Sequence, residues 1–145
     1  MTSLATWLPW CHAGYALADA QTYVATCRDG WEAGSLFAFA IRERAGGQLL
    51  GRIGLSQIDR ANRSANLGYW VRQTHLGRGL AARAARLAAQ FGFGPLKLIR
   101  IEIVIEPGNH ASRRTAERCG ARHRLWLRER ATDAAIYSLL PSDLA

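Results

Sequence analysis

The sequence has few cysteines, no metal-binding pattern and no long apolar run. Its three cysteines (Cys11, Cys27 and Cys119) are an odd number and form no CxxC pair, which argues against a disulfide framework and a structural zinc site. The four histidines form no HxH or HExxH pattern, so we expect no bound metal. No apolar stretch approaches the roughly 20 residues of a membrane-spanning helix, and the N-terminus does not resemble a signal peptide. We therefore expect a cytoplasmic protein with no membrane partner.

The charge balance is strongly basic but almost free of lysine. The chain carries 19 basic and 11 acidic residues, a formal net charge of +8, and only Lys97 among the basic residues is a lysine. Such a charge favours anionic partners, which include both nucleic acids and phosphate-rich cofactors. The arginines are scattered rather than gathered in a tail, and this distribution disfavours a nucleic-acid partner. Charge alone does not identify the partner.

Periodicity and turn residues predict a single α+β domain over residues 1–145. The first three strands are joined by short turns and predict an antiparallel meander. The run from Leu98 to Ile105 is dense in β-branched residues, which predicts a central strand. The expected elements are a helix over 18–33, strands over 36–41, 49–57 and 65–72, a helix over 80–91, a strand over 98–105, a helix over 109–118, and strands near 122–130 and 133–140.

The helix expected over 80–91 carries one apolar stripe at helical spacing, which predicts its buried face. Arg83, Arg86 and Gln90 fall off that stripe. The residues on the stripe are Leu80, Ala81, Ala84, Leu87, Ala88 and Phe91.

The loop that leads into this helix is the most informative segment. Gly77 and Gly79 flank Arg78 directly before the helix. Glycine lets a backbone approach a ligand closely, and the first helical turn offers unpaired N–H donors and a positive dipole end. Together they suit a pyrophosphate. A lone G-x-G is more often a simple strand–helix turn, and the dinucleotide fingerprint fails because Ala82 replaces its third glycine.

In its wider context the sequence resembles the GNAT superfamily of N-acetyltransferases. The family signature Gln/Arg-x-x-Gly-x-Gly/Ala resembles residues 76–81, with Leu76 in place of the first polar residue. Asn109-x-x-Ser112 and a closing Gly120 follow at the family's spacing. The segments 68–71 (GYWV) and 133–140 resemble the RimJ/RimL-type branch of ribosomal-protein N-terminal acetyltransferases. Against the family pattern, we expect the usual N-terminal strand and part of the first helix to be lacking.

The resemblance implies a mixed, mostly antiparallel sheet flanked by helices, with acetyl-CoA as cosubstrate between splayed central strands. It also implies a primary-amine acceptor as partner, and a homodimer is one arrangement that would complete the acceptor side. The cofactor-binding residues that it implies are Trp70, Val71, Arg72, Leu76, Gly77, Arg78, Gly79, Leu80, Ala81, Asn109 and Ser112.

The resemblance also suggests catalytic residues. It implies that Ser112 protonates the leaving thiolate, and we take Glu102 as the candidate general base acting through water. A salt bridge from Glu102 to Arg100 is the structural alternative, as helix capping is for Asn109. Glu129 and Asp133 are weaker candidates for the base. Three tryptophans line an acceptor groove or, as we favour, pack in the core; they are Trp7, Trp10 and Trp31.

The function implied is direct transfer of an acetyl group from acetyl-CoA to a peptide N-terminus or a small amine. No cysteine or serine has a triad-like setting, so no acetyl-enzyme is expected. Two alternatives stay open. One is a catalytically weak or inactive acetyl-CoA-binding module, and the other is a basic protein associated with RNA or the ribosome.

Overall fold

The computed structural model describes residues 13–128 and 133–145 of the chain. Three α-helices and six strands alternate along it, with short 3₁₀ helices before α2 and at the C-terminal end. In chain order the elements are α1 (Leu17–Ala33), β1 (Phe37–Arg42), β2 (Leu49–Asp59), β3 (Ser64–Val71), η2 (Gln73–His75), α2 (Leu80–Phe93), β4 (Arg100–Ile105), α3 (His110–Arg118), β5 (Arg122–Arg128), β6 (Asp133–Leu139) and η3 (Pro141–Leu144).

The strands form one mixed sheet in the order β1-β2-β3-β4-β6-β5. β1, β2 and β3 pair antiparallel as the expected meander, and β4 pairs antiparallel with β6. The pairing of β3 with β4 is parallel. The expected α+β class and mostly antiparallel sheet are confirmed, and β4 is an interior strand as its composition predicts.

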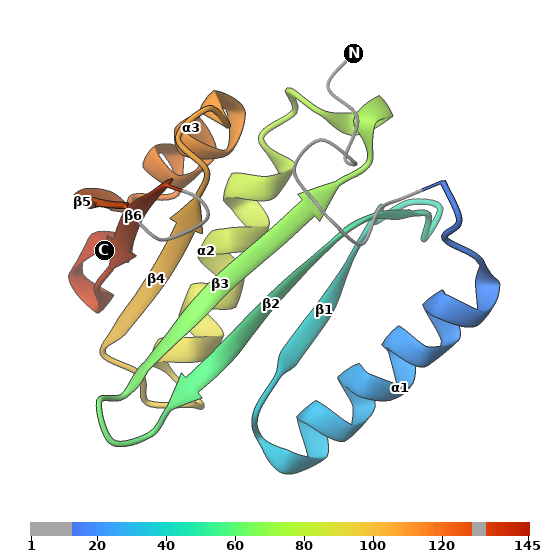
Figure 1. Ribbon diagram of the computed structural model, residues 1–145, viewed down its shortest axis with the longest axis horizontal. Helices are drawn as coiled ribbons and strands as arrows, with labels where there is room; N and C mark the ends of the chain where they lie inside the picture. Colours follow the sequence, from blue (N-terminus) through green and yellow to red (C-terminus); the bar gives the residue numbers. More distant parts are fainter. Residues whose placement is uncertain (1–12, 129–132) are drawn as a thin grey trace.

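The helices lie on different parts of this sheet (Figure 1). α2 packs on β2 and β3, and α3 packs beside α2 on β4 and β5. α1 runs along the β1 edge, where Trp31 meets Phe37 and Phe39 edge-on. Among the described residues, no helix combines the length and apolar character that crossing a membrane requires.

The buried face of α2 is made of small residues, which corrects the predicted stripe. Its buried positions are Ala82, Ala85, Ala88, Ala89 and Gly92, whereas Leu87 is 67% exposed. A Cβ at Gly92 would lie 2.9 Å from Ile101 Cδ1 and 3.1 Å from Leu55 Cδ1. Arg83 and Gln90 are exposed as their place off the stripe predicts, but Leu87 shares that exposed face. Close approach to the sheet selects the smallest side chains instead.

The sheet splits between β3 and β4. The parallel register runs over three pairs, from Ser64↔Arg100 to Asn66↔Glu102. β3 then continues to Val71 and β4 to Ile105 without a further mutual pair in the described residues. The two strands diverge toward the end where α2 and α3 begin (Figure 1). Their facing edges therefore carry main-chain groups that no strand satisfies, and a ligand can pair with them.

Candidate active site

A pocket of about 290 Å³ lies where β3 and β4 separate. Its walls come from four elements: the second half of β3, the end of β4, the first turn of α3 and the start of β6. Most of the lining is apolar, with hydroxyl, amide and carboxyl groups at a few points. The polar lining residues are Tyr69, Glu106, Asn109, Ser112 and Asp133. We refer to this pocket as the cleft.

The glycine loop has a geometry that leaves its main chain open to a ligand. Gly77 has φ of 80° and Gly79 has φ of 70°, a left-handed conformation that disfavours other residues. A Cβ built on either glycine would meet no other atom within 4 Å. Gly79 is the N-cap of α2, and the first turn of that helix has no acidic residue. Its free N–H groups and the exposed Arg78 therefore fit a phosphate-bearing cofactor.

The main chain of β3 divides its hydrogen bonds between β2 and the cleft. The Arg72 N–H donates to the Leu50 carbonyl at 2.7 Å. Because hydrogen-bonded positions alternate along an antiparallel pair, the main-chain groups of Tyr69 and Val71 point away from β2, toward the cleft. Of the predicted strand contacts, Val71 thus offers its main chain to a ligand, whereas the amide of Arg72 is occupied. Trp70 lies between Tyr69 and Val71, half-buried on the opposite face of the sheet.

The signature positions lie in the loop and in the first turn of α2. Leu76 is 53% exposed, so it offers no polar side chain to a phosphate. Leu80 and Ala81 form the first turn of α2 and are half-buried. The anion-binding potential of the loop therefore resides in main-chain N–H groups and in Arg78.

The start of α3 brings together Asn109, Ser112 and Tyr69. Asn109 caps the helix, since its Oδ1 accepts from the Ser112 N–H at 3.2 Å. The Tyr69 hydroxyl donates to the Ser112 carbonyl at 3.0 Å and lies 2.8 Å from Ser112 Oγ. Burial raises the pKa of Tyr69 to about 12. The structural alternative for Asn109 is thus present, and it leaves the side-chain NH₂ of Asn109 available to a ligand.

The carboxylates are distributed differently from the sequence-based hypothesis. Glu102 lies on the part of β4 that still pairs with β3, and its Oε1 is 3.3 Å from Arg100 Nε. It does not line the cleft, whereas Glu106, just beyond β4, and Asp133, at the start of β6, do. Glu129 lies outside the described residues. The structural alternative for Glu102 is therefore the arrangement present.

Sequence reasoning did not single out Tyr69 or Glu106 as site residues. The strand pattern places Tyr69 on one face with Leu67 and Val71, but no local signal links it to Ser112, 43 residues later. Glu106 directly precedes Pro107-Gly108, which reads as a strand end. Its place in the cleft depends on how β4 diverges from β3.

Among the described residues, the cysteine and tryptophan side chains that the sequence singled out do not line the cleft. Cys119 is fully buried at the end of α3, and burial raises its pKa. Trp31 packs on Phe91 as well as on β1, and its Nε1 donates to the Ala38 carbonyl. Trp7 and Trp10 are outside the described residues. Within residues 13–128 and 133–145, no three His, Cys, Asp or Glu side chains cluster to hold a metal ion.

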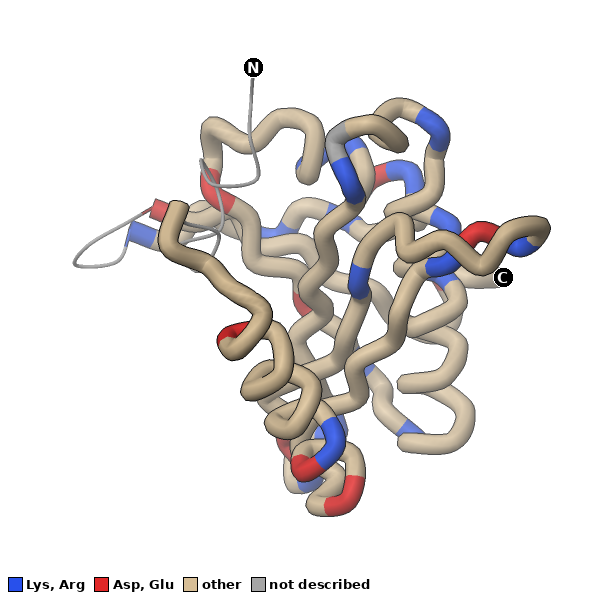
Figure 2. Tube along the Cα trace, turned by 90° about the vertical axis from the view of Figure 1, so that its right-hand side faces the viewer, with Lys and Arg blue, Asp and Glu red and all other residues tan. Residues whose placement is uncertain are grey.

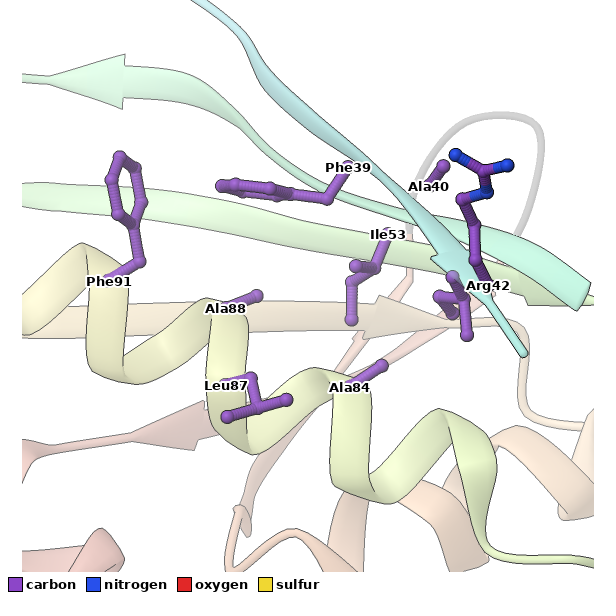
Figure 3. Close-up of a pocket in the computed structure, with 9 residues that line it drawn as sticks. Phe39, Ala40, Arg42, Ile53, Ala84, Leu87, Ala88 and Phe91 are labelled. Carbon is purple, nitrogen blue, oxygen red and sulfur yellow. The ribbon is translucent and has the colours of Figure 1, made fainter. Parts of the chain in front are cut away.

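A second pocket, of about 350 Å³, lies between β1 and α2 (Figure 3). Phe39, Ile53, Leu87 and Phe91 contribute apolar walls. The guanidinium of Arg42 points away from α2 in this view and donates to the Gly47 carbonyl. Of the described residues that line it, none directs a titratable or nucleophilic side chain inward.

Charge is spread over the whole trace rather than gathered on one element (Figure 2). Basic positions lie at the glycine loop, with Arg78 in the loop and Arg83 in the first turn of α2. The carboxylates of Glu106 and Asp133 line the cleft itself. A protonated amine would therefore be attracted at the cleft of a protein whose overall charge is positive.

Comparison with known proteins agrees with this architecture. The sequence model of the acetyltransferase (GNAT) domain matches residues 2–122. This chain belongs to the GNAT acetyltransferase family. Splayed strands and a glycine loop at a helix start, the features that the resemblance implies, are thus present in a GNAT member.

Individual relatives support the RimJ/RimL-type resemblance. The Bacillus subtilis protein named "Putative ribosomal N-acetyltransferase YdaF" is 35% identical over 118 residues, which are 77% of this chain and 60% of that protein. A structure described as a putative ribosomal-protein-serine acetyltransferase from Vibrio cholerae is 26% identical, with a TM-score of 0.86 over 97% of this chain and 82% of that one.

A relative with a different named substrate aligns over a shorter stretch. The spermidine N(1)-acetyltransferase of Escherichia coli K12 is 32% identical over 63 residues, 43% of this chain and 34% of that enzyme. This GNAT chain thus spans between a third and three fifths of the length of these curated relatives.

Proposed function

We propose that this chain transfers the acetyl group of acetyl-CoA to a primary amine. The observation that carries the proposal is one juxtaposition. The diverging edge of β3 leads into a glycine loop at the start of α2, and the same edge faces Ser112 across the cleft. The anion cradle thus follows the same strand segment whose Tyr69 contacts the Ser112 hydroxyl. Family membership supports the same reaction.

Within this proposal the chain binds the cofactor mainly through its main chain. The loop over residues 77–81 and Arg78 hold the pyrophosphate, and Asn109 binds the pantetheine arm together with the cleft-facing edge of β3 around Val71. When bound, acetyl-CoA supplies an activated acetyl thioester. An N–H of the β3 edge polarises the acetyl carbonyl, and Ser112 protonates the departing sulfur.

The attacking amine must lose its proton before or during attack, and the cleft offers carboxylates for this task. Glu106 and Asp133 both line it. Glu102 can serve as the base only if its ion pair with Arg100 opens and a water connects it to the cleft. We therefore propose Glu106 as the first candidate for the base, Asp133 as the second and Glu102 as the third.

For the acceptor we propose a peptide N-terminal amine, with small amines as the next candidates. The names carried by YdaF and by the Vibrio cholerae protein favour ribosomal-protein acceptors. The net charge of +8 disfavours polycations such as spermidine, because like charges slow productive encounter. The shorter alignment with the spermidine enzyme makes that amine the acceptor to test against.

We further propose that transfer is direct. A covalent route needs a nucleophile with an adjacent base, and the buried thiol of Cys119 has a raised pKa. Ser112 contacts a phenol and a helix N-cap rather than a base. The attacking amine therefore meets the thioester itself in the cleft.

The test combines calorimetric titration with acetyl-CoA, thiol release with a panel of peptides and small amines, and mass spectrometry of the protein. We expect binding, amine-dependent thiol release, and no acetylated protein after incubation with acetyl-CoA alone. Binding without release for any amine would instead identify a binding module. Absence of binding would reject the cofactor assignment, and a stoichiometric acetylated cysteine would reject direct transfer.

A further inference from the structure

The Tyr69 phenol connects the two sides of the cleft. It extends from β3 to the first turn of α3, where its hydroxyl oxygen lies 2.8 Å from Ser112 Oγ and 3.0 Å from the Ser112 carbonyl oxygen. Tyr69 and Ser112 both line the cleft. The phenol, with its pKa raised to about 12 by burial, keeps its proton at physiological pH and can act as a donor.

The Ser112 hydroxyl lies in the first turn of α3, which begins at His110 after the N-cap Asn109. No carbonyl of its own helix lies four residues earlier to accept its proton, whereas Thr115, one turn later, donates its Oγ1 to the Ala111 carbonyl at 3.0 Å. Ser112 Oγ meets the Tyr69 hydroxyl at 2.8 Å. If Tyr69 donates to that oxygen, the proton of Ser112 is free to point into the cleft.

We infer that Tyr69 is a positioning residue, which holds the Ser112 hydroxyl as the proton donor for the leaving sulfur. This inference rests on the proposed function. As the C–N bond forms and the C–S bond breaks, Ser112 gives its proton to the departing sulfur. The O–H of Tyr69 then bonds to Ser112 Oγ and offsets its developing negative charge. The attacking amine releases one proton as it becomes an amide, and that proton returns to Ser112, so the protons balance.

Tyr69 has two acceptors on Ser112, so its hydroxyl proton can turn from one to the other and back. One phenol proton can serve either the carbonyl or the hydroxyl of Ser112, which are both within hydrogen-bond distance. A small rotation of the O–H bond turns the phenol proton from the carbonyl to Oγ, and the Ser112 proton can then point into the cleft. The capping bond from Asn109 to the Ser112 N–H holds the main chain fixed meanwhile.

A double-mutant cycle tests this role. The variants are Tyr69→Phe, Ser112→Ala and the two combined, with Tyr137→Phe as the matched control. Tyr137 is another buried tyrosine against α3, where its hydroxyl donates to Glu117 and accepts from Arg113. We expect Ser112→Ala to lower kcat about 100-fold. Tyr69→Phe should lower kcat about tenfold, about 1.4 kcal/mol, with KM for acetyl-CoA nearly unchanged.

The decisive result is the combination. Because Tyr69 acts through Ser112, Tyr69→Phe should cause no further loss in the Ser112→Ala background. Tyr137→Phe should match Tyr69→Phe in any loss of thermal stability but keep the parental kcat. An equal loss from Tyr69→Phe in both backgrounds, or a parental kcat in Tyr69→Phe, would overturn the inference and leave the proposed function intact. If the parent protein and Tyr137→Phe both bind CoA but acetylate no amine, the inference and the proposed function are both overturned.

Discussion

The β3–α2 side of the cleft presents main-chain groups, whereas the α3–β6 side presents side chains. On the first side, the open positions above Gly77 and Gly79 and the start of α2 offer N–H donors. On the second side, Ser112, Glu106 and Asp133 offer a hydroxyl and two carboxylates. A site built from main chain tolerates changes of side chain but not an added Cβ. A site built from side chains depends on single functional groups.

This difference explains why the departure at Leu76 is compatible with the family. Leu76 is exposed and stands where the signature has glutamine or arginine. The glycines beside it still have the left-handed conformation that opens the loop. One polar side chain is lost, but the main-chain N–H groups and Arg78 remain. Cofactor binding on this side should therefore be sensitive to backbone changes above all.

On the main-chain side, the largest expected effect is that of Gly79→Val on cofactor binding. Valine at a φ of 70° is strained, and its side chain would occupy the open space over the loop. We expect CoA affinity to fall well over tenfold, more than about 1.4 kcal/mol, measured by calorimetric titration. Gly47→Val is the control, since Gly47 has the same φ of 70° in the β1–β2 turn. It should lose stability without losing affinity.

If a folded Gly79→Val protein binds CoA like the parent, the loop is not the pyrophosphate site. If Gly47→Val weakens binding equally, the loss reflects general destabilisation instead. Either result would remove the distinction between the two sides of the cleft.

The sequence predicts the glycine-loop side of the site better than the α3–β6 side, because the residues that form the loop are adjacent in the chain. The cradle needs two glycines and a helix start within a few residues, and all of them are adjacent in the chain. Strand bounds are also local: β1 begins at Phe37 and β6 ends at Leu139, each within one residue of expectation. The buried face of α2 was predicted only in part: Ala88 is buried and Arg83 and Gln90 are exposed as expected, but Leu87 lies on the exposed face.

The other side of the cleft depends on contacts between distant segments. Tyr69 meets Ser112 because β3 and β4 separate after Asn66 and Glu102. The same separation leaves Glu102 in the paired part of β4 and brings Glu106 to the cleft. Glutamates four residues apart in one strand segment look equivalent in sequence. Only the register of the parallel pair distinguishes them.

The next prediction compares these two glutamates. We expect Glu106→Gln to lower kcat/KM for the acceptor about tenfold, less than the roughly 100-fold of a sole general base, because Asp133 lines the same pocket. Glu102→Gln removes an exposed ion pair with Arg100, and such pairs contribute little, so activity should change less than about twofold. Steady-state kinetics at saturating acetyl-CoA measures both. The reverse order would restore Glu102 as the base.

The smallest expected effect concerns salt and the acceptor. The net charge of +8 should draw in a peptide with acidic residues after its N-terminal amine and repel spermidine, while Glu106 and Asp133 attract the reacting amine at short range. Exposed charges are screened beyond about 8 Å at roughly 0.15 M salt. The kcat/KM for an acidic peptide should therefore fall a few-fold as salt rises above that concentration, and that for spermidine should rise slightly from a lower value. A neutral peptide of the same length is the control and should change least. A clear preference for spermidine at low salt would contradict the charge argument, and would make the short-range carboxylates of the α3–β6 side the determinant of the acceptor.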